Sequence, residues 1–293
     1  MITINDFLDN ILRDFMEYVD KQERLCDLLD VHFDAGRLPD YSNVHVQQLY
    51  LLRYAYAYAF EYKYIYHRLI EMYNLEKNIT VTSIGCGNLL DYWSLAHVVK
   101  TQSDICYRGI DTIDWSYKID SRSCDDVECT VGNACTLFKN DPHFPSDIYI
   151  FPKSISEFSE QNVHELAKCF TKRNISKNVV HFIFSLRFDS GSKERDINKT
   201  KIFYDKLIEC GFHTNDTHSR HLVFNQDCKD KCISSLDYDF RHPGNVVDYI
   251  KELYKKCSDF DTCNNESNCK SRLGRWPILK CRYAAWQIFT FER

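Results

Sequence analysis

The 293-residue sequence predicts an α/β fold, in which helices cover both faces of a mainly parallel sheet, behind a helical N-terminal region. Two observations lead to this prediction. From residue 76 onward, short apolar runs alternate with helix-like stretches, as in sheets built from strand–helix units. Before residue 76, apolar residues recur at the period of an amphipathic helix. We therefore expect a helical region over residues 1–75 and an α/β domain over residues 76–293.

The N-terminal region contains two predicted helices. The first covers Ile4–Val19, with Thr3 as a candidate N-cap. The second runs over residues 44–74 and contains the segment Tyr-Ala-Tyr-Ala-Tyr-Ala-Phe. Its tyrosines alternate as in a strand, but it has no Gly or Pro and is far longer than ordinary strands. We expect a helix beside the first strand. It either serves only to pack against the domain or forms a lid over a site there. Four of its side chains could reach that site: Arg53, Tyr54, Tyr58 and Tyr62.

Short apolar runs mark the strands of the α/β domain. A further strand is expected just before the turn at Gly132, and helix-like stretches cover residues 89–100, 160–172 and 196–210. A segment rich in Cys, Asp, Asn and Lys, residues 225–280, breaks the alternation and is interpreted as an insertion. The other predicted strands are residues 79–84, 107–110, 147–151, 178–184, 222–224 and 283–291.

Composition and charge exclude several classes of protein. Hydrophobic residues make up 44% and charged residues 27%, which is typical of a globular chain. A formal charge of −5 argues against nucleic-acid binding driven by bulk charge, although it leaves a local basic face open. No segment resembles a signal peptide or a membrane span, so we expect a soluble cytoplasmic protein without a membrane partner. In that compartment the 14 cysteines are expected to be thiols or metal ligands.

The segment from Val81 to Asp91 reads as a strand, a turn with Gly85 and Gly87, and the start of a helix. Glycines in such a turn let the backbone approach a ligand closely, and the helix start offers free N–H groups. Asp111 closes the next strand, where a carboxylate can accept hydrogen bonds from both hydroxyls of a ribose. Asn133 lies in the turn after the third strand, where its amide could meet an adenine edge.

This order of glycine turn, acidic strand end, Gly-Asn-Ala turn and fourth-strand exit resembles the class I S-adenosylmethionine-dependent methyltransferase superfamily. The resemblance covers roughly residues 73–224 and the final strand. It implies a Rossmann-like, seven-stranded sheet with an antiparallel last strand, and S-adenosylmethionine as cofactor. The sequence departs from the family at Ser83, usually acidic, at Leu89, usually glycine, and at Asn133, usually aspartate. The residues that we assign to the cofactor are Ser83, Gly85, Cys86, Gly87, Asp91, Asp111, Asn133, Ala134 and Phe151.

Two other functions stay open at this point. A nicotinamide dinucleotide-dependent oxidoreductase would need a glycine where Leu90 stands and a second mononucleotide-binding half, which we do not find. A catalytically inactive, methyltransferase-like binding module is the second alternative, because a fold does not guarantee an activity.

Methyl transfer requires a nucleophile in line with the departing sulfur and, for some acceptors, a proton acceptor. The loop after the fourth strand offers Glu157 and Lys153 as candidate catalytic residues. In the alternative interpretation neither is catalytic: Glu157 is a carboxylate at the start of a helix, and Lys153 is a solvated surface lysine. The Asn-Pro-Pro-aromatic signature of exocyclic amine methylases is absent. We favour RNA over a small molecule or protein as acceptor, because the tyrosine-rich helix is similar to RNA methyltransferase-like proteins. Basic residues also cluster at Lys168, Lys172, Arg173 and Lys177, and at Arg272, Arg275, Lys280 and Arg282.

The insertion is predicted to be a substrate-facing subdomain with a candidate zinc site. Zinc prefers soft ligands in a tetrahedral arrangement, and a segment with few apolar residues would gain order from such a site. The spacing does not match paired C-x-x-C knuckles, so unlinked thiols are the alternative. The candidate ligands are Cys228, Cys232, Cys257, Cys263 and Cys269, with His242 nearby.

Overall fold

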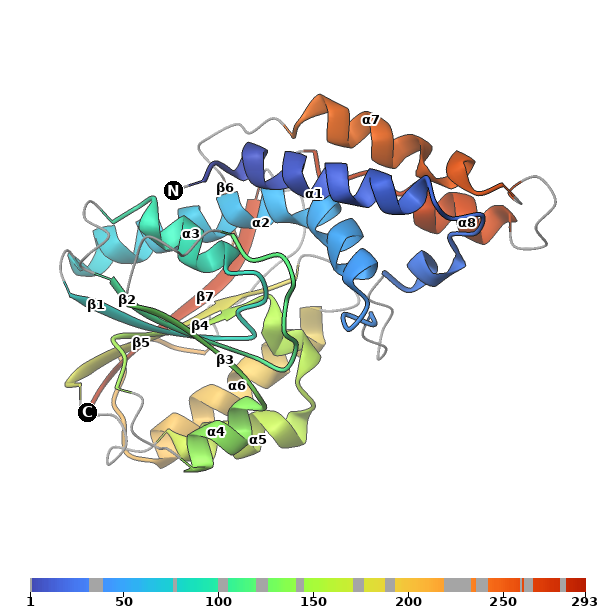
Figure 1. Cartoon of the computed structure of the whole chain (residues 1–293). Coiled ribbons are helices and arrows are strands. Elements are labelled where there is room, and N and C mark those ends of the chain that lie inside the picture. The colour runs from blue at the N-terminus through green and yellow to red at the C-terminus, as the bar shows by residue number, and fades with distance from the viewer. Residues whose placement is uncertain are drawn as a thin grey trace.

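The computed structural model contains one central sheet between two helical layers (Figure 1). Helices α4, α5 and α6 cover one face of the sheet. Helices α2 and α3 cover the other face, and α1, α7 and α8 lie outside them. The model describes residues 2–31, 39–75, 78–99, 105–119, 126–140, 145–170, 177–187, 193–218, 233–235, 242–258, 260, 266–279 and 283–293.

Six strands form the mixed sheet in the order β3-β2-β1-β4-β5-β7. The first five are parallel, and β7 runs antiparallel to β5, as predicted. A three-residue strand, β6 (Ile233–Ser235), pairs with the start of β7. The seven-stranded sheet is not confirmed, because the predicted strand at residues 222–224 lies outside the described residues. The six strands are β1 (Ile79–Ile84), β2 (Ile105–Asp111), β3 (Val127–Val131), β4 (Ile148–Pro152), β5 (Val179–Ser185) and β7 (Tyr283–Glu292).

Strand β4, in the middle of the sheet, is apolar along its whole length because helices cover it on both sides. Along β4, Ile148 and Ile150 belong to the core that faces α1, α2 and α3. Tyr149 and Phe151 belong to the core on the opposite face, with residues of α5 and α6. Two hydrophobic cores therefore hold the sheet, one on each face.

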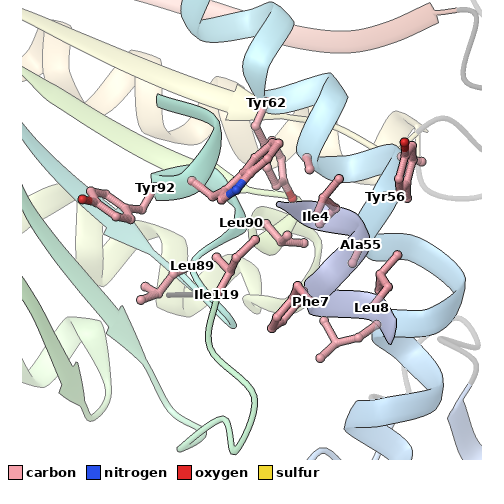
Figure 2. Close-up of a cluster of buried hydrophobic side chains, with 14 of the residues drawn as sticks. Ile4, Phe7, Leu8, Ala55, Tyr56, Tyr62, Leu89, Leu90, Tyr92 and Ile119 are labelled. Carbon is pink, nitrogen blue, oxygen red and sulfur yellow. The ribbon is translucent and has the colours of Figure 1, made fainter. Parts of the chain in front are cut away.

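Both predicted N-terminal helices are confirmed. Helix α1 (Ile4–Val19) begins at Thr3, whose hydroxyl accepts the Asp6 N–H at 3.1 Å. Helix α2 (Val44–Tyr73) is one continuous 30-residue helix that ends at Asn74 in the left-handed conformation. Figure 2 shows apolar side chains of α1, among them Ile4 and Phe7, in one cluster with α2 and the start of α3.

The helices of the insertion pack on the N-terminal helices. Arg53 of α2 donates hydrogen bonds to the carbonyl oxygens of Arg272 and Leu273, each at 2.8 Å, and its own carbonyl accepts the N–H of Ile278. We call α1, α2, α7 and α8 together the cap. Among the described helices, none is long and apolar enough to cross a membrane. The remaining helices are α3 (Leu90–Ala96), α4 (Ala134–Asn140), α5 (Glu160–Cys169), α6 (Lys193–Glu209), α7 (Gly244–Glu252) and α8 (Glu266–Leu273).

Candidate functional site

A cavity of about 670 Å³ lies at the carboxyl ends of β1, β2, β4 and β5, beneath the cap. Its floor contains the loops that follow these strands, and its roof contains α2 together with Arg275 and Ile278 of the insertion. The chain passes from β1 to α3 and from β4 to α5 on opposite faces, so the cavity lies at the switch point of the sheet. Open α/β sheets bind their ligands at this place.

The glycine turn after β1 forms one wall of the cavity. Gly85 has φ +77° and Gly87 has φ +53°, a region that favours glycine. A Cβ on Gly85 would lie only 2.4 Å from the Cβ of Ser154, so the turn is pressed against the loop after β4. Leu89, at the place of the usual third glycine, also takes a left-handed conformation, with φ +68°. The backbone at Leu89 therefore has the left-handed conformation that favours glycine, although a buried leucine occupies the position.

Asp111 faces the same cavity from the end of β2. Its carboxylate accepts the N–H groups of Gly87 at 2.8 Å and Ile113 at 2.9 Å, one on each oxygen. Burial raises the pKa of Asp111 above its ordinary value, while these backbone hydrogen bonds act in the opposite direction. A carboxylate has about four lone-pair sites. The Thr112 N–H and the Trp115 ring also act to lower its pKa, and Asp111 presents its remaining acceptor capacity to the cavity.

Two further polar side chains lie under the glycine turn and line the cavity. Asp91 accepts the Tyr107 hydroxyl at 2.9 Å on both oxygens, and burial raises its pKa to about 6. Asn88 is 5% exposed, and its amide nitrogen has no hydrogen-bond partner within the described part of the chain. A buried donor without a partner is costly, so a ligand that accepts from Asn88 would be favoured.

Lys153 and Glu61 form a buried ion pair at the cavity. The Lys153 Nζ lies 2.5 Å from Glu61 Oε2, donates to the Leu186 carbonyl at 2.8 Å, and lies 5.3 Å from the centre of the Tyr58 ring. The Lys153 side chain is 8% exposed, so the solvated-lysine alternative is wrong. The Glu61 carboxylate compensates the positive charge of the Lys153 ammonium and fixes its position. Sequence analysis did not identify Glu61, which comes from α2.

Glu157 ends the 3-10 helix η3 (Ser154–Glu157) and lines the cavity. Its side chain is 34% exposed, and Arg187 lies 3.4 Å from its carboxylate. The surrounding walls nevertheless raise its pKa to about 7 through burial, with Arg187 acting in the opposite direction. Lys199 of α6 donates to the carbonyls of Ile155 and Ser156 and thereby holds η3 in place. Glu157 is thus a carboxyl group that can exchange a proton near neutral pH.

Aromatic rings form the wall opposite the strand ends, and we call them the aromatic wall. The four tyrosines of α2 in this wall recur every four residues, so they share one face of the helix. The predicted access of Tyr54, Tyr58 and Tyr62 to the site is confirmed, and that of Arg53 is wrong, because its guanidinium bonds to the insertion. The members of the aromatic wall are Tyr41, Tyr50, Tyr54, Tyr58, Tyr62 and Trp115.

Four of the nine residues assigned to the cofactor do not line the cavity. Ser83 is fully buried within β1. Phe151 is fully buried on the other face of the sheet, 4.8 Å from the ring centre of Phe184. Asn133 is exposed and accepts the Thr136 N–H at 3.3 Å, and Ala134 is buried as the first residue of α4. The other five, Gly85, Cys86, Gly87, Asp91 and Asp111, lie together at the cavity.

The predicted zinc ligands are only partly described. Cys257 and Cys269 are both buried, and the Cys257 thiol lies 3.8 Å from the Glu23 carbonyl oxygen. Cys228, Cys232 and Cys263 lie outside the described residues. Within the described ranges, no group of three or more His, Cys, Asp or Glu side chains could hold a metal ion. The zinc site stays a prediction.

The predicted basic clusters lie in different places. Lys168 pairs with Glu165 at 3.0 Å and Lys177 with Asp147 at 2.8 Å, near the start of β5, at the opposite edge of the sheet from the cavity. Arg272 donates to the Leu29 carbonyl, whereas Arg275 lines the cavity. Lys172, Arg173, Lys280 and Arg282 fall outside the described ranges.

Known structures resemble this fold at low sequence identity. A methyltransferase from Aquifex aeolicus, described as dependent on S-adenosylmethionine, matches at 14% identity over 52% of this chain and 81% of that one, with a TM-score of 0.35. The YcgJ protein of Bacillus subtilis matches at 14% over 78% and 98%, with a TM-score of 0.41. The cyclase SpnF matches at 10% over 97% and 92%, with a TM-score of 0.40. No protein-family model matches the chain, and no curated protein sequence does.

These likenesses are too weak to indicate a reaction or a substrate. The strand arrangement is more informative, because β7 lies antiparallel beside β5, as the resemblance to class I methyltransferases implies. The described strands therefore have the arrangement that the resemblance to class I methyltransferases implies. A dinucleotide-binding sheet of the usual order would have a parallel strand at the place of β7, so the nicotinamide-dependent alternative is disfavoured.

Proposed function

We propose that the protein is an S-adenosylmethionine-dependent methyltransferase. The observation that carries the proposal is the union, in one cavity, of the left-handed turn at Gly85 and Gly87 with the Asp111 carboxylate at the next strand end. The close packing of Gly85 on Ser154 leaves no room for a side chain at the turn. Gly85 and Gly87 both line the cavity, so a ligand there would meet the backbone of the turn with no side chain between.

The donors and acceptors at the cavity fit this cofactor. Asp111 would accept from its ribose hydroxyls, and Asp91 and the amide of Asn88 would meet its amino-acid end near the glycine turn. When bound, the cofactor supplies an electrophilic methyl group on a sulfonium. Ser83, Asn133, Ala134 and Phe151 are left out of this binding set, because none of them lines the cavity.

The remaining cavity residues support transfer to an acceptor. The aromatic wall covers one side of the cavity with ring surface, which would keep water from that side of the reacting groups. Glu157 is placed after β4 and, with a pKa of about 7, can accept a proton from an acceptor group near neutral pH. Lys153, held by Glu61, is a fixed cation beside Tyr58 and is proposed to position groups in the cavity.

RNA is the acceptor class that we propose to test first. Arg275 at the cavity supports it, whereas Lys168 and Lys177 do not, because they lie at the opposite edge of the sheet. The insertion contributes Arg275 and Ile278 to the roof, which supports its proposed role as a substrate-facing part of the α/β domain. A cytoplasmic location completes the proposal, with a structural zinc in the insertion as the alternative to unlinked thiols.

Two measurements test the proposed function. Calorimetry with S-adenosylmethionine should give saturable 1:1 binding. Transfer of a tritiated methyl group should then be compared across total RNA, lysate protein and small metabolites. Binding without transfer to any fraction would support the inactive binding module, and absence of binding would refute the proposal. Elemental analysis of protein purified without added metal tests the zinc site.

A further inference from the structure

The aromatic wall is continuous and comes from three segments of the chain. Tyr50 and Tyr54 have ring centres 5.2 Å apart, and Tyr54 stacks on Tyr58 at 5.7 Å. Tyr41, just before α2, lies 5.3 Å from Tyr50, and Trp115, in the loop after β2, lies 5.7 Å from it. Aromatic rings attract other planar rings through stacked and edge-to-face contacts, beyond the effect of burial alone.

The titratable group of the site lies beside this wall. Burial is the main reason why the pKa values of Tyr41 and Tyr50 are raised well above the ordinary value. The charges of Glu157 and Arg187 also influence both phenols, with Glu157 raising their pKa and Arg187 lowering it. Glu157, Arg187 and the tyrosines also line the same cavity. A ring held against the wall would therefore have a proton acceptor within the same cavity.

Charge in the cavity argues against a cationic acceptor. An aromatic cage can bind an ammonium group, but here Lys153 already lies against the ring of Tyr58. Arg187 and Arg275 line the cavity as well and would repel a second cation. Of the four carboxylates that line the cavity, Glu61 and Glu157 are paired with Lys153 and Arg187. The other two, Asp91 and Asp111, lie at the glycine turn, where the proposed cofactor would bind. The wall therefore suits an uncharged or anionic ring.

We propose, on the basis of the function proposed above, that the methyl acceptor is a planar aromatic ring with a nucleophilic nitrogen or oxygen, held against Tyr50, Tyr54 and Tyr58. In the transfer, the ring nucleophile forms its bond to the methyl carbon as the carbon–sulfur bond breaks, and that electron pair stays on sulfur. The proton of the ring N–H or O–H passes to the Glu157 carboxylate. A base in single-stranded RNA and a free aromatic molecule share this chemistry.

The test measures acceptor binding by calorimetry in protein saturated with S-adenosylhomocysteine. The probes are nucleosides, single-stranded RNA oligonucleotides and phenol, with cyclohexanol and choline as a non-planar and a cationic control. We expect nucleosides or oligonucleotides, together with phenol, to bind more tightly than both controls. Oligonucleotide binding without nucleoside binding would identify RNA as the source of the ring, and the reverse would identify a small molecule.

Matched variants separate the wall from general packing. Tyr54→Leu and Tyr58→Leu should each weaken binding of the aromatic probes about tenfold, since each removes one stacking face. Affinity for S-adenosylhomocysteine should stay within about twofold. Tyr56 serves as the control, because it lies on α2 but packs against Phe60 and His242, outside the cavity walls. Tyr56→Leu should leave probe binding unchanged.

Two results would overturn the inference while leaving the proposed function intact. In the first, the protein binds S-adenosylhomocysteine, but cyclohexanol or choline binds as tightly as the aromatic probes, or no aromatic probe binds at all. The other is unchanged probe affinity in both tyrosine variants. The comparison of phenol with cyclohexanol uses the wild-type protein, so it stands even where a variant fails to fold. Failure to bind S-adenosylhomocysteine would instead refute the proposed function.

Discussion

The ammonium of Lys153 lies 2.5 Å from the carboxylate of Glu61, and both side chains are more than nine-tenths buried. Lys153 directly follows β4, while Glu61 lies in the middle of α2, so the ion pair joins the cap to the strand ends. Lys153 adopts φ +60°, a conformation that costs free energy for a residue with a side chain. The contact thus holds a strained backbone position at the cavity.

Removal of one partner of this pair should destabilise the protein strongly. Glu61→Gln leaves the Lys153 ammonium buried without a counter-charge, and loss of one member of a buried pair costs about 3–5 kcal/mol. The double variant with Glu61→Leu and Lys153→Met should recover most of the loss, because no uncompensated charge remains. The measurement is the free energy of unfolding in urea.

The exposed pair of Lys21 and Glu17, at 2.6 Å, provides the control. Lys21→Met should change the free energy of unfolding far less than Glu61→Gln does, because solvent screens an exposed pair. If Glu61→Gln were as mild as Lys21→Met, the buried pair would have no role in joining the cap to the sheet.

Asp111→Ala should weaken binding of S-adenosylmethionine about a hundredfold, since it removes a charged acceptor of two hydroxyl hydrogen bonds. Calorimetry checks this. The control is Asp114→Ala, since Asp114 lies three residues further along the same loop, is exposed and pairs with Lys118 at 2.8 Å. A folded Asp111→Ala protein with wild-type affinity would refute the placement of the ribose.

Much of the fold could be predicted from local pattern. Helix α2 was predicted in spite of its alternating tyrosines, because 30 residues without Gly or Pro suit a helix and not a strand. Strand β4 was also predicted, but not which way its side chains point. Ile150 and Phe151 are both apolar and face opposite cores, since a strand covered on both sides has no polar alternation to mark its faces. Phe151 was therefore assigned to the wrong side of the sheet.

The site residues that directly follow a strand could be predicted from the sequence. Those that depend on contacts between distant segments, such as the contact of the cap with the strand ends, could not. Gly85, Gly87 and Asp111 occupy positions that the order of strands defines. Glu61 gave no signal, because its partner lies 92 residues away in the sequence and an isolated glutamate on a helix is usually solvated. Arg187 depends in the same way on a tertiary contact with Glu157.

Gly85→Ala should destabilise the protein and lower its cofactor affinity. The added Cβ would meet the Ser154 Cβ at 2.4 Å, and φ +77° strains any residue with a side chain. Gly244→Ala is the control, because a Cβ there meets nothing within 4 Å at the start of α7. Thermal unfolding should show a lower Tm for Gly85→Ala and an equal or higher Tm for Gly244→Ala. Equal Tm values below wild type would mean that the turn has no special constraint.

Methyl transfer should depend on pH through Glu157. Burial raises the pKa of this carboxyl to about 7, so it is mostly protonated at pH 6 and mostly a carboxylate at pH 8. Because a proton acceptor must be unprotonated, kcat/KM should rise through about pH 7 and then level off. Glu157→Gln should lower kcat/KM and abolish this rise. A profile that keeps the same midpoint in Glu157→Gln would assign the titration to another group.

Leu89→Gly restores the glycine that related turns carry, yet it should destabilise this protein. The left-handed backbone at φ +68° costs a non-glycine residue about 1–2 kcal/mol, which the substitution would relieve. However, Leu89 is fully buried among α1, α2 and α3, where loss of a leucine side chain costs about 2–5 kcal/mol (Figure 2). The net loss in the free energy of unfolding is therefore expected to be up to about 4 kcal/mol in urea denaturation. A more stable Leu89→Gly protein would show that backbone strain, and not side-chain burial, dominates at the cofactor turn.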